Sequence, residues 1–165
     1  DESEASSEFI TEQLGLEPVF IEDMHRSLHP VKDLKSYKQI VKIIREFKPD
    51  IVHTHAAKAG AIGRLAAHRM KVPVILHTFH GHVFHSYFGK AKTLFYKTVE
   101  RYLGKKSASI IAISDIQKKE LSEIHRVAPS EKFKVINLGF DLDRFTLNRN
   151  SLRKGFLEYG HCIYL

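Results

Sequence analysis

The feature that most constrains the fold is a regular alternation between short apolar runs and longer segments that suit helices. The runs lie at residues 51–54, 72–76, 109–113 and 133–138, and a helix-like segment separates each from the next. They show no polar alternation, which is typical of strands that helices cover on both faces. Strands that alternate with helices at this spacing indicate βαβ units. We therefore predict an α/β fold, a parallel sheet with helices on both faces.

Helices are predicted at 34–47, 56–70, 88–104 and 114–126. The first and third carry apolar side chains at intervals of three and four residues, the second is rich in small residues, and the fourth begins with the capping-box spacing of Ser114 and Gln117. Asp33 can cap the first helix and Pro49 can end it. In the third helix the side chains predicted to face the core are Phe88, Ala91, Phe95, Thr98 and Tyr102.

The chain has 165 residues, enough for one domain with a buried core. We predict an acidic segment at 1–16, a domain at 17–145 whose first strand lies at 17–22, and a linker or the start of a second domain at 146–165. The first residue is not Met, so we expect a natural start further upstream. An acidic start without an apolar stretch predicts no secretory signal. No apolar run reaches the ~20 residues that cross a bilayer.

The charge is distributed unevenly along the chain. There are 26 basic and 19 acidic residues, and eight of the acids but no Lys or Arg lie in residues 1–25, which leaves 26 basic and 11 acidic residues in the other 140. A net charge of +15 on these 140 residues attracts phosphate-bearing partners such as nucleic acid, nucleotides or anionic lipid. The need for solubility alone also explains such a charge. Aromatic and basic residues interleave at 84–106. That pattern fits a segment on an anionic membrane surface or a core-facing helix with a solvated back.

The candidate site lies where the predicted strands end, because ligands of open α/β sheets bind at the carboxyl ends of the strands. Two histidines stand in His53-Thr-His55 and four in the run from His77 to His85. An imidazole titrates near neutrality and can donate a hydrogen bond to a phosphate or sugar hydroxyl, or carry a proton. A hydrogen-bonded structural histidine is the alternative reading for each of them.

Other chemistries leave weaker signals. His53 with His55, or His80 with His82, could chelate zinc, but the spacing matches no standard zinc motif and no carboxylate lies in the cluster. The chain contains neither a GxGxxG nor a Walker A sequence. Gly60 and Gly63 allow either the approach of an anion to a helix end or close helix packing. Lys58 and Arg64 in the same region are phosphate contacts or solvated charges. The single cysteine, Cys162, excludes an internal disulfide and fits a reducing compartment.

Five motifs in order resemble the amino-terminal domain of bacterial family 4 glycosyltransferases, over about residues 17–145. They are Pro49-Asp-Ile-Val-His-Thr-His55, then Gly60 with Gly63-Arg64, His77-Thr-Phe-His-Gly-His82, Ile111-Ala-Ile-Ser114, and Val135-Ile-Asn-Leu-Gly-Phe-Asp141 with Phe145. The His-Thr-Phe-His-Gly-His run is most similar to capsule and exopolysaccharide enzymes. The resemblance implies a GT-B fold, in which two Rossmann-like domains face a cleft and this chain is part of the acceptor-side domain.

The resemblance also implies an activity: transfer of a sugar, with retention of configuration, from a nucleotide-sugar that is expected to be UDP-linked. The acceptor is expected to be lipid-linked or a saccharide, as in surface polysaccharide synthesis. No metal, other cofactor or nucleic acid is expected. The location implied is cytoplasmic, with peripheral contact at the inner membrane. His80 matches the histidine beside the reacting centre. The implied acceptor-side residues are His55, Lys58, Arg64, Gly81, His82 and Ser114.

The chain departs from the family pattern at both ends. Nothing before Glu17 supplies the first strand and its glycine-rich loop, and no second domain with a basic clamp for the leaving diphosphate follows Phe145. We therefore expect the isolated chain to be inactive. We also expect an unpaired sheet edge that favours dimerisation. Two other classes stay open from the sequence: a non-enzymatic basic module that binds nucleic acid or anionic membrane, and a fragment of a sugar-nucleotide 2-epimerase.

Overall fold

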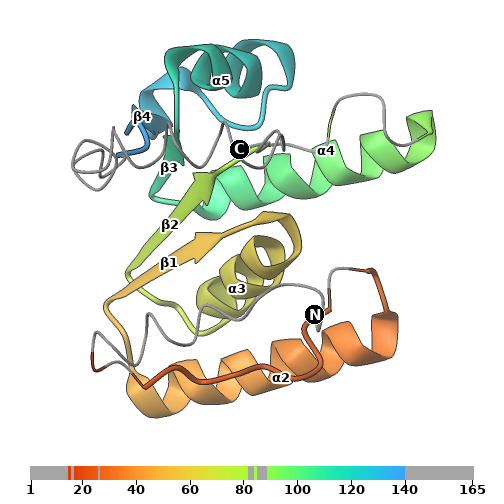
Figure 1. Ribbon diagram of the computed structural model, residues 1–165, viewed down its shortest axis with the longest axis vertical. Coiled ribbons are helices and arrows are strands. Elements are labelled where there is room, and N and C mark those ends of the chain that lie inside the picture. Colours follow the sequence, from red (N-terminus) through yellow and green to blue (C-terminus); the bar gives the residue numbers. More distant parts are fainter. Residues whose placement is uncertain (1–14, 16, 26, 82–83, 85–88, 140–165) are drawn as a thin grey trace, which may run out of the picture.

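The computed structural model describes residues 15, 17–25, 27–81, 84 and 89–139 (Figure 1). The strands are β1 (Ile51–His55), β2 (Val74–Phe79), β3 (Ser109–Ala112) and β4 (Phe133–Val135). The helices are α2 (Pro30–Phe47), α3 (Ala57–Arg69), α4 (Lys90–Lys106) and α5 (Asp115–Lys119), with a π-helical turn, η1 (Glu120–Ile124), after α5 and a 3-10 turn, η2 (Ser130–Lys132), before β4. The predictions for 1–14, His82 and 146–165 lie outside the described residues.

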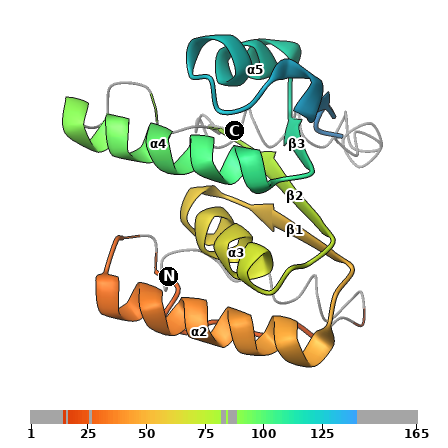
Figure 2. The same cartoon turned by 180° about the vertical axis from the view of Figure 1, so that it is seen from behind.

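The four strands form one parallel sheet in the order β1-β2-β3-β4, which confirms the predicted Rossmann-like α/β class. Figures 1 and 2 show α2, α3, α4 and α5 following one another in that same order. A sheet built in sequential order with right-handed crossovers carries its connecting helices on one face. The described helices therefore supply one of the two predicted helical layers.

The alternation of side chains along the strands separates the two faces of the sheet. On the helical face the buried side chains are Thr54, Ile75, His77, Phe79, Ile110, Ala112 and Phe133. On the other face, here called the open face, Ile51, His53 and His55 of β1 are exposed. Since successive residues of a strand point to opposite faces, the His-Thr-His run divides between the two. This division decides which histidines a ligand can reach.

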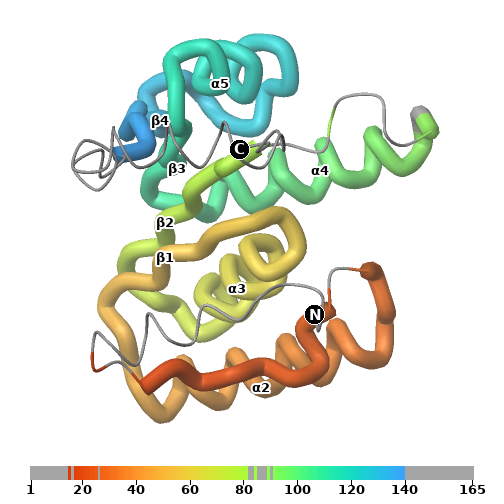
Figure 3. The backbone as a smooth tube through the Cα atoms, viewed as in Figure 1, coloured from red at the N-terminus to blue at the C-terminus, as the bar shows by residue number. Residues whose placement is uncertain are grey.

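Two corrections concern the start of the described chain. The predicted strand at 17–22 is absent from the described sheet, and Figure 3 shows this segment running beside α2, where Gln39 Nε2 donates to the carbonyl oxygen of Phe20 at 3.3 Å. The cap of α2 is His29, whose Nδ1 accepts from the Lys32 amide at 3.5 Å. Asp33 instead accepts from the His29 amide at 3.1 Å. Pro30 at the first helical position fits this start, because its missing N–H needs no partner there.

The predicted core-facing stripe of α4 is wrong for its described residues, and its first member, Phe88, lies outside them. Phe95 and Tyr102 are 58% and 48% exposed, whereas Glu100 and Leu103 are buried. The buried face is rotated by about one residue, some 100° around the helix, from the stripe that the aromatic spacing indicated. Apolar residues occur on both sides of α4, so their spacing alone did not identify the side that packs.

Only part of the predicted apolar face of α2 is covered. Ile44 is buried beside Ala66 and Ala67 of α3, while Leu34 and Phe47 are 53% and 79% exposed. The reason is position, since α2 packs against α3 at the β1 end of the helical layer rather than over the centre of the sheet. A helix at this place is covered along one narrow stripe.

Candidate functional site

Two histidines predicted for the site meet at the carboxyl edge of the sheet. Nδ1 of His55, the last residue of β1, lies 2.9 Å from Nε2 of His80, which directly follows β2. Their rings stack with centroids 5.2 Å apart. The parallel pairing of β1 with β2 brings both strand ends to this place. Each imidazole is exposed, so the pair is accessible to a ligand.

His53 and Thr78 extend the pair along the open face. The ring of His53 lies 4.3 Å from that of His55, centroid to centroid, and its Nε2 lies 2.8 Å from Thr78 Oγ1. Partial burial lowers the pKa of His55, and the neighbouring His53 and His80 lower it further. A neutral His55 has one donor and one acceptor nitrogen, so its Nδ1 can either donate to or accept from His80. We call His53, His55, His80 and Thr78 the histidine rim.

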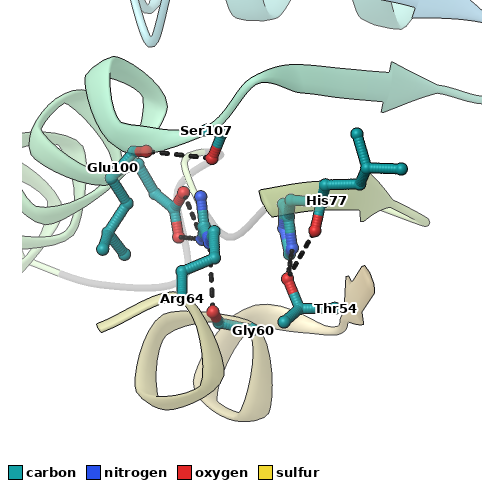
Figure 4. A network of polar contacts seen from close by, with 8 residues as sticks. Thr54, Gly60, Arg64, His77, Glu100 and Ser107 are labelled. Carbon is teal, nitrogen blue, oxygen red and sulfur yellow. Dashed lines mark hydrogen bonds and ion pairs between the residues drawn. The ribbon is translucent and has the colours of Figure 1, made fainter. Parts of the chain in front are cut away.

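Behind the rim, on the helical face, lies a buried polar network (Figure 4). Arg64 of α3 donates through Nη2 to both carboxylate oxygens of Glu100 on α4, at 2.9 and 2.8 Å, and through Nε to the Gly60 carbonyl at 3.0 Å. Arg64 is 0% and Glu100 7% exposed. Burial raises the pKa of Glu100 and lowers that of Arg64, and the attraction between the two charges opposes both changes. The pair links two neighbouring helices.

His77 belongs to this network and not to the rim. Its Nδ1 lies 2.9 Å from Thr54 Oγ1, which also donates to the Leu76 carbonyl at 3.1 Å. The ring is 1% exposed, and burial, together with the nearby positive charge of Arg64, lowers the pKa of His77 to about 3. A Cβ on Gly60 would lie 2.4 Å from the His77 ring, so this glycine is needed for packing.

The remaining predicted site residues are placed differently from the rim. Lys58 binds Asp33 and the Ser27 carbonyl oxygen, both at 2.5 Å, so its ammonium is already engaged. Arg64 is enclosed by the network above and reaches no surface ligand in this structure. Ser114 follows β3 at the same sheet edge as the rim, and its Oγ accepts from the Gln117 amide at 3.1 Å, which confirms the predicted cap of α5.

Gly81 follows His80 and is exposed, with nothing within 4 Å of a Cβ built on it. That open space leaves the backbone beside His80 accessible. His82 lies outside the described residues. Within the described ranges, no group of three or more His, Cys, Asp or Glu side chains is placed to hold a metal ion. The helices described here include none with the length and apolarity of a membrane span.

Glu100 was not singled out in the sequence analysis. Its position contained a signal, because Glu100 lies four residues after Tyr96 and three before Leu103, on the face of α4 that packs inward. A carboxylate on such a face requires a buried partner. The partner, Arg64, stands 36 residues away, and no local pattern identifies it.

Comparison with known proteins adds to this geometry. Residues 6–144 match the family described as Glycosyltransferase Family 4. The chain is 34% identical over 140 residues to the Escherichia coli protein named UDP-Gal:alpha-D-GlcNAc-diphosphoundecaprenol alpha-1,3-galactosyltransferase. This alignment covers 84% of the chain and 36% of the relative, so the chain spans about a third of that protein.

Solved structures share the fold. A glycosyltransferase from Rickettsia africae ESF-5 superposes with a TM-score of 0.65 at 24% identity, over 98% of this chain and 41% of that one. A UDP-GlcNAc 2-epimerase from Neisseria meningitidis superposes with a TM-score of 0.55 at 15% identity, over 92% of this chain and 41% of the epimerase. At these identities the likeness concerns the fold alone.

Proposed function

Since the chain belongs to glycosyltransferase family 4, we propose that it forms the acceptor-side part of an enzyme that transfers a sugar from a UDP-sugar to a lipid-linked or saccharide acceptor. The observation that carries this proposal is the histidine rim, an accessible pair of imidazoles at the sheet edge where α/β folds bind ligands. The name of the Escherichia coli relative, with its UDP-linked donor and diphosphoundecaprenol acceptor, supports these two substrate classes. Surface polysaccharide synthesis, of the capsule or exopolysaccharide type, is the corresponding role.

His80 is proposed to contact the transferred sugar. Its Nε2 is engaged by His55, so its Nδ1 is the nitrogen that remains to meet a hydroxyl or phosphate oxygen. His55 fixes the orientation and tautomer of that ring, as a hydrogen-bonded partner does for a ligand histidine. Transfer is proposed to proceed with retention and without a metal, so chelation by EDTA is expected to leave the activity unchanged.

The enzymatic test uses the complete coding sequence that contains this chain. UDP release is measured with a panel of UDP-sugars and polyprenyl-diphosphate-linked acceptors. His80→Ala is expected to abolish transfer without changing the circular dichroism spectrum, and His55→Ala to lower kcat. His68→Ala, which removes an exposed histidine from α3, is the matched control and should behave as the parent. No UDP release with any pairing, or full activity of His80→Ala, would refute the proposal.

Two observations bear on the alternatives. The family match and the 34% identical relative favour a glycosyltransferase over both the 2-epimerase and the non-enzymatic basic module. The 2-epimerase resembles the chain only in fold, at 15% identity. We therefore propose neither alternative as the function, and no nucleic-acid partner.

Peripheral contact with the inner membrane, from the cytoplasmic side, is part of the proposal, and α4 is the segment that supports it. Leu94 and Phe95 are 61% and 58% exposed on α4, and Lys106 lies over the ring of Tyr102, with Nζ 5.5 Å from the centroid. Exposed apolar and basic side chains together suit an anionic lipid surface. Phe95→Ser is expected to weaken sedimentation with phosphatidylglycerol vesicles, whereas Phe47→Ser on α2 should not. Equal effects of the two substitutions would argue against this surface.

Dimerisation through a sheet edge is also proposed. β1 lies at one end of the described strand order, and its Ile51 is 57% exposed. An edge strand offers backbone N–H and C=O groups to a second copy. Light scattering on the purified chain should give the mass of a dimer, and a monomer at all concentrations would contradict this expectation.

A further inference from the structure

A basic pocket lies on α4 at the side of the molecule away from the histidine rim. It has a volume of about 300 Å³ and is lined by Arg101 and Lys105 of α4, by Ser122 of η1, and by the segment from Arg126 to Pro129. Figure 2 shows α5 and the turn after it on the side of the carboxyl-terminal half of α4. The residues that line the pocket therefore come from two parts of the chain that are distant in sequence.

The topology separates this pocket from the rim. The end of α4 leads into the start of β3, and the segment after η1 leads into the start of β4, so the pocket lies at the amino edge of the sheet. The rim lies at the carboxyl edge, after the ends of β1 and β2. A ligand in the pocket would thus occupy a site different from the one proposed for sugar transfer.

Three cations border the pocket, and no acidic side chain lines it within the described part of the chain. Arg101 is oriented by one bond, from its Nε to the His125 carbonyl at 3.1 Å, which leaves its Nη groups for another acceptor. Lys105 and Arg126 are exposed. Like charges around one concavity repel each other, and an anion bound between them removes that repulsion.

The backbone conformation of Arg126 explains how this residue comes to border the pocket. Its φ of 51° lies in the left-handed region, which disfavours any residue with a bulky side chain. Arg126 follows His125, the C-cap of η1, and the next amide, that of Val127, donates to the Leu121 carbonyl at 2.9 Å, which is a common way for a left-handed residue to end a helix. The left-handed residue turns the chain at this point, and the segment from Arg126 to Pro129 then lines one side of the pocket.

The shape of the pocket indicates the class of ligand. Arginine forks match the oxygens of a phosphate, and three cations suit its double charge better than the single charge of a carboxylate. Val127 and Ala128 are buried and form an apolar wall together with Pro129. A volume of about 300 Å³ exceeds a bare phosphate, which leaves room for a carbon substituent against this wall. We propose that this pocket binds a phosphate ester or diphosphate, either a soluble one or the headgroup of a lipid.

The experiment measures binding of inorganic pyrophosphate to the chain, followed by ¹⁵N–¹H NMR at low ionic strength. Amide shifts are expected at 101–105 and 122–128 and not at His55 or His80. Arg126→Asn removes the charge but keeps a residue that tolerates a positive φ, so the fold is retained. It should weaken binding about tenfold, the effect of one charge-assisted hydrogen bond. Lys38→Gln, an exposed charge on α2, is the matched control and should not change the affinity.

A second arm identifies the source of the phosphate. Sedimentation with phosphatidylglycerol vesicles that pyrophosphate competes away, and that Arg126→Asn weakens, assigns the pocket to a lipid headgroup. Pyrophosphate binding without such competition assigns it to a soluble phosphate. The proposal is overturned if pyrophosphate causes no shifts, if the shifts map outside the pocket, or if Arg126→Asn binds as tightly as the parent.

Discussion

Replacing Glu100 by glutamine tests the ion pair that joins α3 and α4. The substitution keeps the size of the side chain but leaves the guanidinium of Arg64, which is 0% exposed, without a counter-charge. Removing one partner of a buried pair costs about 3–5 kcal/mol. Glutamine still offers one acceptor oxygen in place of two, so we expect the free energy of unfolding to fall by about 3 kcal/mol, the lower end of that range. Against a total stability of roughly 5–15 kcal/mol, this is a large loss.

The assay is urea unfolding of the chain at pH 7 and 25 °C, followed by circular dichroism. Arg64→Met combined with Glu100→Leu removes both charges together. The free energy of unfolding of this double variant should lie within about 1 kcal/mol of the parent value, because a buried apolar pair leaves no charge without a partner. Glu46→Gln is the control, since it breaks a 3.9 Å contact with Lys42 at 74% and 65% exposure and should have no measurable effect.

Two results would refute this reasoning. If Glu100→Gln loses less than about 1 kcal/mol, the guanidinium has found water or another acceptor, and the pair is not the buried link described above. If the double variant is destabilised as strongly as the single one, shape rather than charge explains the loss. Comparison of the single with the double variant separates these cases, since Arg64 and Glu100 are in direct contact.

Two further predictions follow from the same region. The pKa of His77 is lowered to about 3, so the folded state keeps this histidine neutral while the unfolded state binds a proton below about 6.5. The free energy of unfolding is therefore unaffected by this group above about pH 6.5 and decreases as the pH falls toward 3, with a limiting slope of about 1.4 kcal/mol per pH unit. His77→Gln should flatten the curve of unfolding free energy against pH. Gly104→Ala places a Cβ 2.5 Å from the Val127 carbonyl oxygen and should cost about 2 kcal/mol in urea unfolding, whereas Gly139→Ala, with free space, should not. A pH curve unchanged by His77→Gln, or a stable Gly104→Ala, would contradict these assignments.

The strands were predictable because their signal is local. Each is a short β-branched or apolar run, and the cap of α5 follows from the spacing of Ser114 and Gln117 alone. The rim was predictable in outline because parallel strands end at a common edge, so histidines after neighbouring strands must come together there. The Arg64–Glu100 pair was not, since its partners are distant in sequence and each looks like a surface charge by itself.

The burial of His77 shows how an error in a predicted strand boundary assigns a core residue to the site. The strand was predicted to end at residue 76, which places His77 in a loop with His80, but β2 continues to Phe79. Once the strand includes His77, the period of two places it on the same face as Ile75 and Phe79. It then belongs to the core, whereas His80, which lies beyond the strand end, contacts His55.

The core and the site depend on one register. Thr54 pairs with His77 across β1 and β2. Gly63 of α3 packs closely on the methyl group of Thr54, since a Cβ on Gly63 would lie 2.9 Å from that methyl carbon. A slip of one residue would turn Thr54 to the open face and His55 into the core. The buried contacts of Thr54 therefore keep His55 at the edge where it meets His80, so a structural threonine positions the histidine that we propose for the site.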